Sequence, residues 1–361
     1  MADGRDAWNG IIQSVDVTRI IFSLLFPKEK KEDTTETWMR KLTDLLKVQF
    51  ILNQTQIATL DSNGIGAAGA ASIAQSLASN TTLTSLDLES NGIGAAGATS
   101  IAQSLASNTT LTSLYLSRNG IGAAGAASIA QSLASNTTLT SLDLESNHIR
   151  VAGAASIAQS LASNKTLTSL DLAGNGIEDT GAASIVQSLA SNTTLTSLDL
   201  DCNGIGAAGA ASIVQSLASN TTLTSLHLES NGIGAAGAAS IAQSLASNTT
   251  LTSLDLESNG IGAAGAASIA QRLVSNTNAR LVLMLSAPQL LYKQGMREIA
   301  VSHLQNIPLN LSVLCFNMDH YPPKVSNYKC YAKSNNIVDT GMEGCVSWHQ
   351  TLAWKAMVGQ S

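Results

Sequence analysis

The sequence has few of the large and charged side chains that build most globular cores and surfaces. Aromatic residues are 4% of its 361 residues, charged residues are 12%, and there are 5 prolines. Small and polar residues dominate instead, above all Ala, Ser, Gly, Asn and Thr, together with Leu. A compact core of large side chains is therefore not expected, and packing must come from small residues at close backbone approach.

Cysteine is scarce as well. The four cysteines, Cys202, Cys315, Cys330 and Cys345, are widely spaced and form no C-x-x-C pair. We therefore expect free thiols in a reducing compartment.

Signals for export and for membrane insertion are also missing. The first ten residues, MADGRDAWNG, do not resemble a signal peptide. The apolar run from Ile11 to Phe26 is interrupted by Gln13, Asp16 and Arg19, which leaves it too polar and too short to cross a bilayer. We therefore expect a cytoplasmic protein with no membrane partner. N-x-S/T sequons such as that at Asn80 are interpreted as repeat sequence.

What the sequence has in abundance is a repeat with a period of 28 residues. The unit LTSLDLESNGIGAAGATSIAQSLASNTT begins at Leu83, and near-copies begin at Leu111, Leu139, Leu167, Leu195, Leu223 and Leu251. A degenerate unit precedes them, in which Thr55 replaces the first Leu. About eight units thus occupy residues 55–278.

Each unit combines the pattern of a strand with that of a short helix. The motif L-x-x-L-x-L-x-x-N-x-I has alternating apolar positions, which are typical of a half-buried strand. The segment ATSIAQSLASN then places Ala98, Ile101, Ala102 and Leu105 at helical spacing. One strand and a helix of roughly three turns cannot bury an apolar face alone, so the units must stack on one another.

The pattern L-x-x-L-x-L-x-x-N-x-I-x-x-x-G-A followed by an Ala/Leu helix resembles the leucine-rich repeat of the ribonuclease-inhibitor subtype. NOD-like receptors and Ran GTPase-activating protein have the same type of unit. The resemblance implies an α/β fold: a right-handed leucine-rich-repeat solenoid, or horseshoe, with a parallel sheet on its concave face and helices on its convex face. It implies little about function, because this fold serves many partners.

The two ends of the chain depart from the repeat. Residues 1–54 are expected to form a helical N-terminal cap, residues 279–316 a C-terminal cap, and residues 317–361 a loosely ordered tail. Near the C-terminus, five residues have the types that ligate zinc: Cys315, His320, Cys330, Cys345 and His349. Their spacing matches no zinc module, so no metal site is assigned there.

The repeat also contains a glycine-rich loop with the form of a dinucleotide-binding motif. In NGIGAAGAASIA, Gly64, Gly66 and Gly69 make G-x-G-x-x-G between a strand and a helix. A pyrophosphate cradle needs the first two glycines, yet His148 and Arg150 replace them in one unit. Only the third glycine is present in every unit. We therefore interpret the loop as structural and expect no nucleotide cofactor.

Acidic residues line the outward side of the predicted strands. If Leu86 and Leu88 point inward, alternation places Asp87 and Glu89 on the concave face. The Asp87 column continues through Tyr115, Asp143, Asp171, Asp199, His227 and Asp255. The Glu89 column comprises Asp61, Glu89, Ser117, Glu145, Ala173, Asp201, Glu229 and Glu257. These columns hold 11 of the 13 acids of the array, which has four bases, so the array is strongly acidic.

This charge predicts a non-enzymatic scaffold for protein–protein interaction that binds a basic protein or peptide on its acidic concave face. The same charge disfavours nucleic acid, whose phosphates would be repelled. A second interpretation is that the acids are copies produced by recent duplication, which simply keep the array soluble. Two other functions stay open: a regulator of a GTPase, resembling Ran GTPase-activating protein, and an immune or effector-type sensor module.

Positions that break the repeat are the most informative part of this face. Tyr115 and Arg118 are residue types typical of interface anchors. The predicted partner-binding residues are Asp87, Glu89, Tyr115, Arg118, Asp143, Glu145, Asp171, Asp199, Asp201, His227, Glu229, Asp255 and Glu257.

Two chemical alternatives are considered for the same face. An Asp and a Glu two residues apart could mimic the carboxylate pair of a glycosidase, but nothing in the sequence would bury either acid. His227 between Asp199 and Asp255 could hold a metal ion, although a lone imidazole in an open acidic face is more often simply exposed. No catalytic residue, metal ligand or cofactor is therefore assigned.

Overall fold

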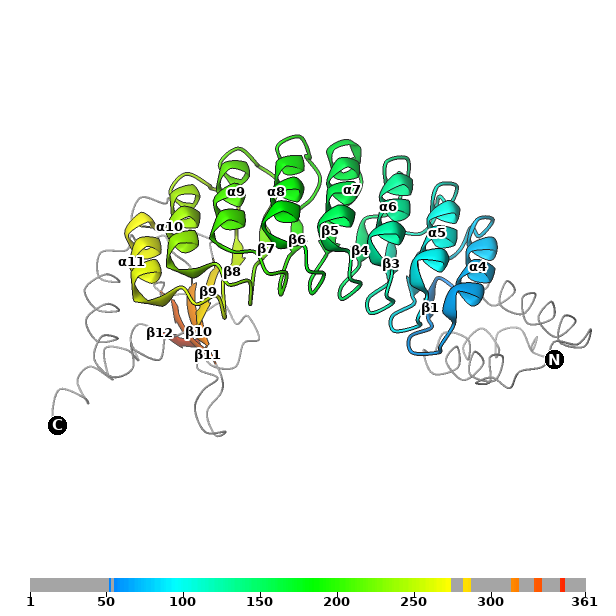
Figure 1. The fold of residues 1–361 in the computed structure, drawn as a ribbon, viewed down its shortest axis with the longest axis horizontal. Helices are drawn as coiled ribbons and strands as arrows, with labels where there is room; N and C mark the ends of the chain where they lie inside the picture. The colour runs from blue at the N-terminus through cyan, green and yellow to red at the C-terminus, as the bar shows by residue number, and fades with distance from the viewer. Residues whose placement is uncertain are drawn as a thin grey trace, which may run out of the picture. The chain divides into compact units, whose positions relative to one another are not determined.

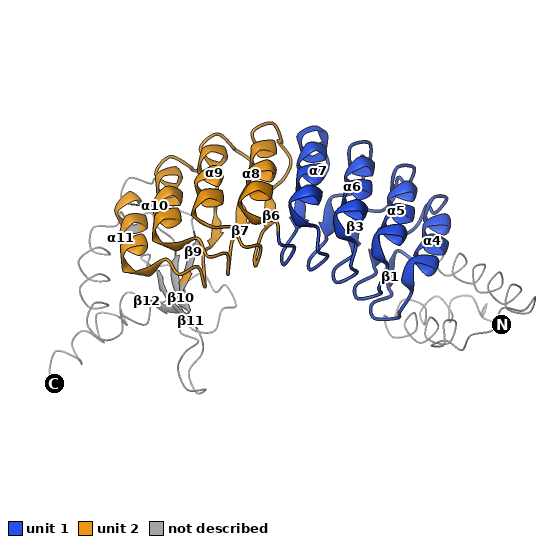
Figure 2. Ribbon diagram, in the orientation of Figure 1, with its two compact units in different colours: residues 1–176 blue, residues 177–361 orange. Residues whose placement is uncertain are grey.

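A computed structural model describes Leu52 and residues 55–273, 282–286, 313–317, 328–332 and 345–347. The chain divides into two units, residues 1–176 (unit 1) and residues 177–361 (unit 2), which Figure 2 shows in different colours.

Unit 1 alternates short strands with helices of three turns. Its elements are β1 (Ile57–Thr59), α4 (Gly66–Leu77), β2 (Ser85–Asp87), α5 (Gly94–Leu105), β3 (Ser113–Tyr115), α6 (Gly122–Leu133), β4 (Ser141–Asp143), α7 (Arg150–Ser163) and β5 (Ser169–Asp171). Successive strands pair in parallel with a register of one repeat, so that Asp87 lies opposite Tyr115 and Tyr115 opposite Asp143.

Unit 2 continues the alternation with α8 (Glu178–Leu189), β6 (Ser197–Asp199), α9 (Ala207–Leu217), β7 (Ser225–His227), α10 (Gly234–Leu245), β8 (Ser253–Asp255), α11 (Gly262–Leu273) and β9 (Val282–Ser286). The strands β6 to β9 again pair in parallel. Three further strands follow: β10 (Val313–Asn317), parallel to β9, then β11 (Tyr328–Ala332), antiparallel to β10, and β12 (Cys345–Ser347), parallel to β11.

The core of each unit lies between the strands and the helices, which stack side by side on one face of the sheet (Figure 1). In the repeat that begins at Leu83, Leu86 of β2 and the flanking Leu83 and Leu88 are completely buried, as are Ile101 and Leu105 of α5. These are the positions that the alternating and helical spacings predict. The predicted parallel α/β solenoid of leucine-rich repeats is therefore confirmed within each unit.

A buried Asn side chain holds the turn after each of the strands β2 to β8. The Asn119 carboxamide accepts the backbone N–H groups of Asn91 at 2.9 Å and Ile93 at 3.3 Å. It donates to the carbonyl groups of Leu88 at 2.8 Å and Leu116 at 2.9 Å. Equivalent bonds recur in neighbouring repeats, so the Asn side chains form a ladder that satisfies backbone groups which the irregular turns leave unpaired.

A second buried Asn follows each of the helices α4 to α10, and it belongs to the recurring sequon. The Asn108 carboxamide donates to the Leu77 carbonyl at 2.9 Å and accepts the N–H groups of Thr110 at 3.0 Å and Leu111 at 2.8 Å. Only 4% of Asn108 is exposed. The sequon at this position is therefore a packing element, which agrees with its interpretation as repeat sequence.

The three glycines of the loop meet different demands. An added Cβ at Gly97 would lie 2.5 Å from Ile93 Cγ2 and 2.9 Å from Ala70 Cβ, so this third glycine permits close approach between helices. The first two, Gly92 and Gly94, have φ of +65° and +63° and open space around them. They are glycines because L-residues avoid this left-handed backbone conformation.

Only part of the predicted N-terminal cap, C-terminal cap and tail lies within the described residues. Leu52 is buried, and its carbonyl accepts a hydrogen bond from Asn80 at 2.9 Å, but the rest of the predicted cap over residues 1–54 lies outside the described residues. Strands β9 and β10 fall largely within the predicted C-terminal cap, and β11 and β12 fall within the predicted tail. The domain boundaries stay predictions. No helix in the described part of the chain has the length and apolarity needed to span a membrane.

Candidate functional site

In each unit, the candidate site is the face of the strands opposite the helices. In β2 and β4 the central Leu is buried, whereas the flanking Ser and Asp are half-buried and share the other face. The turn residues two positions after these Asp residues, Glu89 and Glu145, are also half-buried. We call Asp61, Asp87, Glu89, Asp143, Glu145 and Asp171 the acid face of unit 1, and Asp199, Asp201 and Glu229 the acid face of unit 2.

The Asp carboxylates have a structural role that the sequence analysis missed. Asp87 accepts the backbone N–H of Glu89 at 2.9 Å, and Asp143 accepts that of Glu145 at 2.9 Å. Asp171, Asp199 and Asp255 repeat the same bond two residues on. The spacing D-x-[EDA] at the end of each strand was the available signal, because Asp commonly forms such turns. Part of the Asp column therefore serves the fold itself.

The acid face of unit 1 is incompletely neutralised. Burial raises the pKa of Asp143 above its usual range, the Glu145 N–H lowers it, and the neighbouring carboxylates of Glu145, Glu89 and Asp87 raise it further. Burial likewise raises the pKa of Asp87, with added repulsion from Asp61 and Glu89. Like charges therefore accumulate here at a cost to stability.

Arg118 is the basic residue placed within this face. Its guanidinium donates to Glu89 Oε1 at 2.9 Å and to Glu145 Oε1 at 3.1 Å, which joins three consecutive repeats. The two glutamates raise the pKa of Arg118. Arg118 was predicted from the sequence to contact a partner, whereas in the structure its charge is engaged by two acids of the same face.

Tyr115 lies between the paired acids of unit 1. It stands opposite Asp87 on β2 and Asp143 on β4, and 38% of it is exposed. The neighbouring Ser117 is buried. Of the residues that break the repeat in this unit, Tyr115 therefore presents an accessible aromatic surface and Ser117 does not.

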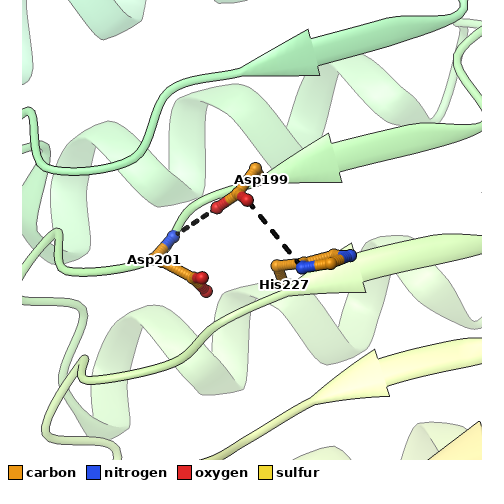
Figure 3. Close-up of side chains that lie close together, drawn as sticks. All are labelled: Asp199, Asp201 and His227. Atoms are coloured by element: carbon orange, nitrogen blue, oxygen red, sulfur yellow. Dashed lines mark hydrogen bonds and ion pairs between the residues drawn. The ribbon is translucent and has the colours of Figure 1, made fainter. Parts of the chain in front are cut away.

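In unit 2 two residues that differ from the repeat consensus, Asp201 and His227, lie close to each other and to Asp199 (Figure 3). His227 Nδ1 lies 3.8 Å from Asp199 Oδ2, and its Nε2 lies 3.0 Å from Ser225 Oγ. Asp201 comes from the turn that follows Asp199, and its carboxylate joins the pair. The ligand atoms of Asp199, Asp201 and His227 all lie within 4.8 Å of one another. His227 does lie between Asp199 and Asp255 in the strand register, as the sequence predicts, but the third member of the close group is Asp201 and not Asp255.

The carboxylate of Asp201 accepts a hydrogen bond that an Asp at the position of His227 accepts in several other repeats. In five other described repeats an Asp accepts the N–H two residues ahead, whereas His227 occupies that place before Glu229. Asp201 of the preceding repeat accepts the Glu229 N–H instead. Burial, with repulsion from Asp199, raises the pKa of Asp201 to about 7 despite this bond.

Two of the predicted contact residues are not accessible. Asp255 is 8% exposed and Glu257 is 3% exposed, so neither contributes to the exposed acid face of unit 2. Alternation along the strand fixes which side a residue faces, but it does not report what covers that side. Cys202 is exposed and is a free thiol, and burial of its sulfur with nearby Asp201 raises its pKa.

The residues considered for a zinc site near the C-terminus are placed at backbone level only. Cys315 lies opposite Cys330 in the register of β10 and β11, and Cys330 lies opposite Cys345 in that of β11 and β12. Three cysteines thus share one row, whereas His320 and His349 lie outside the described residues.

Comparison with known families agrees with this architecture. A family model described as leucine-rich repeat matches residues 79–102, 107–130, 135–158, 163–186, 191–214, 219–242 and 247–270. The chain is a leucine-rich-repeat protein with units of the ribonuclease-inhibitor-like type.

Two solved structures illustrate the similarity. One is leiomodin-1 actin-binding site 2, at 30% identity over 34% of this chain and 71% of that chain, with a TM-score of 0.31. The other is the leucine-rich-repeat-containing protein LegL7 from Legionella pneumophila, at 23% identity over 76% of this chain and 86% of that chain, with a TM-score of 0.49. A comparison with curated proteins found no match. We draw no functional conclusion from either likeness.

Proposed function

We propose that this leucine-rich-repeat scaffold binds a basic protein or peptide on the acid face of unit 1. The observation that carries the proposal is the alignment of six acids along five parallel strands, with Arg118 as the base among them. Burial is the main cause of the raised pKa values of Asp87 and Asp143, and repulsion from neighbouring carboxylates raises both further. A partner that supplies Lys or Arg side chains would relieve this repulsion.

The residues of this face divide into two roles. Asp87, Asp143 and Asp171 each have an oxygen bonded to a backbone N–H, so they supply charge from fixed positions. Tyr115 supplies an exposed aromatic surface beside them, which suits packing against the aliphatic stem or guanidinium of a basic side chain. Arg118 competes with the partner for Glu89 and Glu145.

The proposal is tested by neutralising the three aspartates together. In the triple variant Asp87→Asn, Asp143→Asn and Asp171→Asn, each amide oxygen can still accept the turn N–H, so the backbone is preserved. We expect the affinity for fluorescently labelled Lys/Arg-rich peptides to fall, and its dependence on salt to become shallower. Glu178→Gln, which removes a charge at the start of α8, is the control and should leave both unchanged. An unaltered affinity and salt slope in the triple variant would contradict the proposal.

The remaining parts of the functional prediction rest on the sequence. They are the absence of enzymatic activity, the cytoplasmic location and the exclusion of nucleic acid. Regulation of a GTPase is also a prediction from the type of repeat, and a turnover assay with candidate GTPases would test it. Stimulated turnover by wild type that persists in the triple variant would favour that function over peptide binding at the acid face.

A further inference from the structure

We propose that Asp199, Asp201 and His227 form a binding site for one divalent transition-metal ion, with Zn²⁺ as the best fit. Each residue offers one ligand atom, and the three atoms lie within 4.8 Å of one another (Figure 3). In a tetrahedral zinc site with bonds of about 2.0–2.1 Å, ligand atoms are roughly 3.4 Å apart. Small side-chain rotations therefore suffice to close the site around an ion.

The imidazole is already oriented for this role by a residue outside the cluster. His227 Nε2 lies 3.0 Å from the hydroxyl oxygen of Ser225, and Nδ1 lies 3.8 Å from Asp199 Oδ2. When the Nε2–H donates to Ser225, the lone pair of Nδ1 faces the two carboxylates. Metal-ligating histidines usually donate their second ring N–H to an oxygen in this way, which fixes the tautomer and the ring.

The two carboxylates are held by the backbone. Asp199 accepts the Asp201 N–H at 2.9 Å through Oδ1, which leaves Oδ2 toward the imidazole. Asp201 accepts the Glu229 N–H of the next repeat. Each carboxylate therefore has one oxygen anchored and the other available, so little side-chain order has to be gained on binding.

The repeats supply an internal comparison. In unit 1 the equivalent positions are Asp143, Glu145 and Asp171, with Ser169 in place of Ser225. Two departures separate unit 2 from this pattern: Asp for Glu at 201, and His for Asp at 227. Among the residues that the structure describes, only the unit 2 set brings three ligand atoms this close. The departures thus convert a row of acids into a mixed nitrogen and oxygen site.

The mixed set selects the class of metal. Imidazole nitrogen favours Zn²⁺ and neighbouring first-row ions, whereas Ca²⁺ and Mg²⁺ prefer oxygen ligands alone. Two carboxylates with a neutral imidazole balance the charge of a divalent ion. Three protein ligands leave a fourth position for water or for a side chain of a partner.

The test compares the full-length wild type with His227→Asp, using Zn²⁺ alone as the probe and a chromogenic chelator as competitor. Asp143 and Asp171 occupy the position of His227 in other repeats, so this variant is expected to fold. We expect the variant to bind one Zn²⁺ fewer, or to bind that ion at least about 100-fold more weakly. Ser225→Ala should weaken the same site by about 10-fold, the lower end for loss of a supporting hydrogen bond.

Other histidines and cysteines are present in both proteins, so only the difference between them reports this site. Identical zinc stoichiometry and affinity in wild type and His227→Asp would overturn the proposal. Ca²⁺ binding that is tighter than Zn²⁺ binding and survives the substitution would overturn it as well, because the acids alone would then be responsible. Peptide binding to unit 1 is a separate readout, so failure of this site leaves the proposed function unaffected.

Discussion

The acid faces of the two units are built on the same backbone and differ in a few side chains. In unit 1, Arg118 joins Glu89 to Glu145 and neutralises part of the face. In unit 2, His227 meets Asp199 and Asp201. The strand register, the Asn ladder and the helix-packing glycines are shared by both units. We call these three shared features the frame. The comparison shows that buried residues fix the frame, so the exposed side chains of the acid faces can vary in their chemistry.

The largest expected effect breaks the frame itself. Asn119→Ala removes the acceptor of the Asn91 and Ile93 N–H groups and leaves both buried without a partner. Because each such group costs about 1–3 kcal/mol, we expect a loss of about 3 kcal/mol or more in the free energy of unfolding by chemical denaturation. Gln103→Ala, on the exposed side of α5, is the control and should change it by less than about 0.5 kcal/mol. A loss no larger than that of the control would mean that the ladder does not fix the frame.

The second effect concerns the contact between helices. Gly97→Ala places a Cβ 2.5 Å from Ile93 Cγ2 and 3.2 Å from the backbone of Ala67, so the neighbouring helix must shift. We expect a loss of about 1–3 kcal/mol in the same measurement, as for other overpacked sites. Ala96→Ser, one residue earlier on the exposed side, should have a much smaller effect. Equal stability of the two variants would show that the third glycine is not required by packing.

A smaller effect of opposite sign is expected where the loop has lost a glycine. His148 has φ of 58° in the position that other repeats give to a glycine with positive φ. His148→Gly should therefore raise the free energy of unfolding by about 1 kcal/mol, because it relieves the left-handed strain. His148→Asn should gain less, since Asn tolerates this conformation only partly. Destabilisation by His148→Gly would indicate that the side chain has a role in the loop that outweighs its strain.

The smallest expected effect is a pH-dependent change in thermal stability when Asp143, on the acid face of unit 1, is neutralised. The pKa of Asp143 in the folded state is raised from its usual 3.8, mainly by burial. The folded state therefore holds this proton more tightly, and the cost of ionisation appears as the pH rises between the unfolded and folded pKa values. Asp143→Asn should raise the thermal midpoint at pH 7.5, and this gain should vanish near pH 3. A gain that is independent of pH would contradict the assignment.

Much of the fold was predictable from the sequence because its determinants are local and repeated. The strand and helix periods, the inward Leu and Ile positions and the required third glycine all follow from one 28-residue pattern. The two columns of the face follow from alternation. These features depend on the position of a residue within one repeat, and the same residue types recur at the same positions in the neighbouring repeats.

The chemistry of the face was less predictable because it depends on contacts between repeats. Arg118 was predicted as a partner contact, but its reach to Glu89 and Glu145 spans the repeats on either side. Asp201 accepts the N–H of Glu229 in the next repeat, and this contact is visible only when two repeats are paired. The simultaneous departures at 201 and 227 were the signal in the sequence. Burial of Asp255 and Glu257 left no such signal.

The most direct test of the central claim, that a shared frame carries interchangeable face chemistry, is to move the unit 2 site into unit 1. Starting from Asp201→Glu with His227→Asp, we would add Glu145→Asp and Asp171→His, with Arg118→Ser to remove the nearby cation. The measurement is the stoichiometry of Zn²⁺ bound in competition with a chromogenic chelator. The account predicts that one ion is lost in the starting variant and regained in the final one. Loss without recovery in a folded protein would show that the frame of unit 1 does not support the same site, and would contradict the claim.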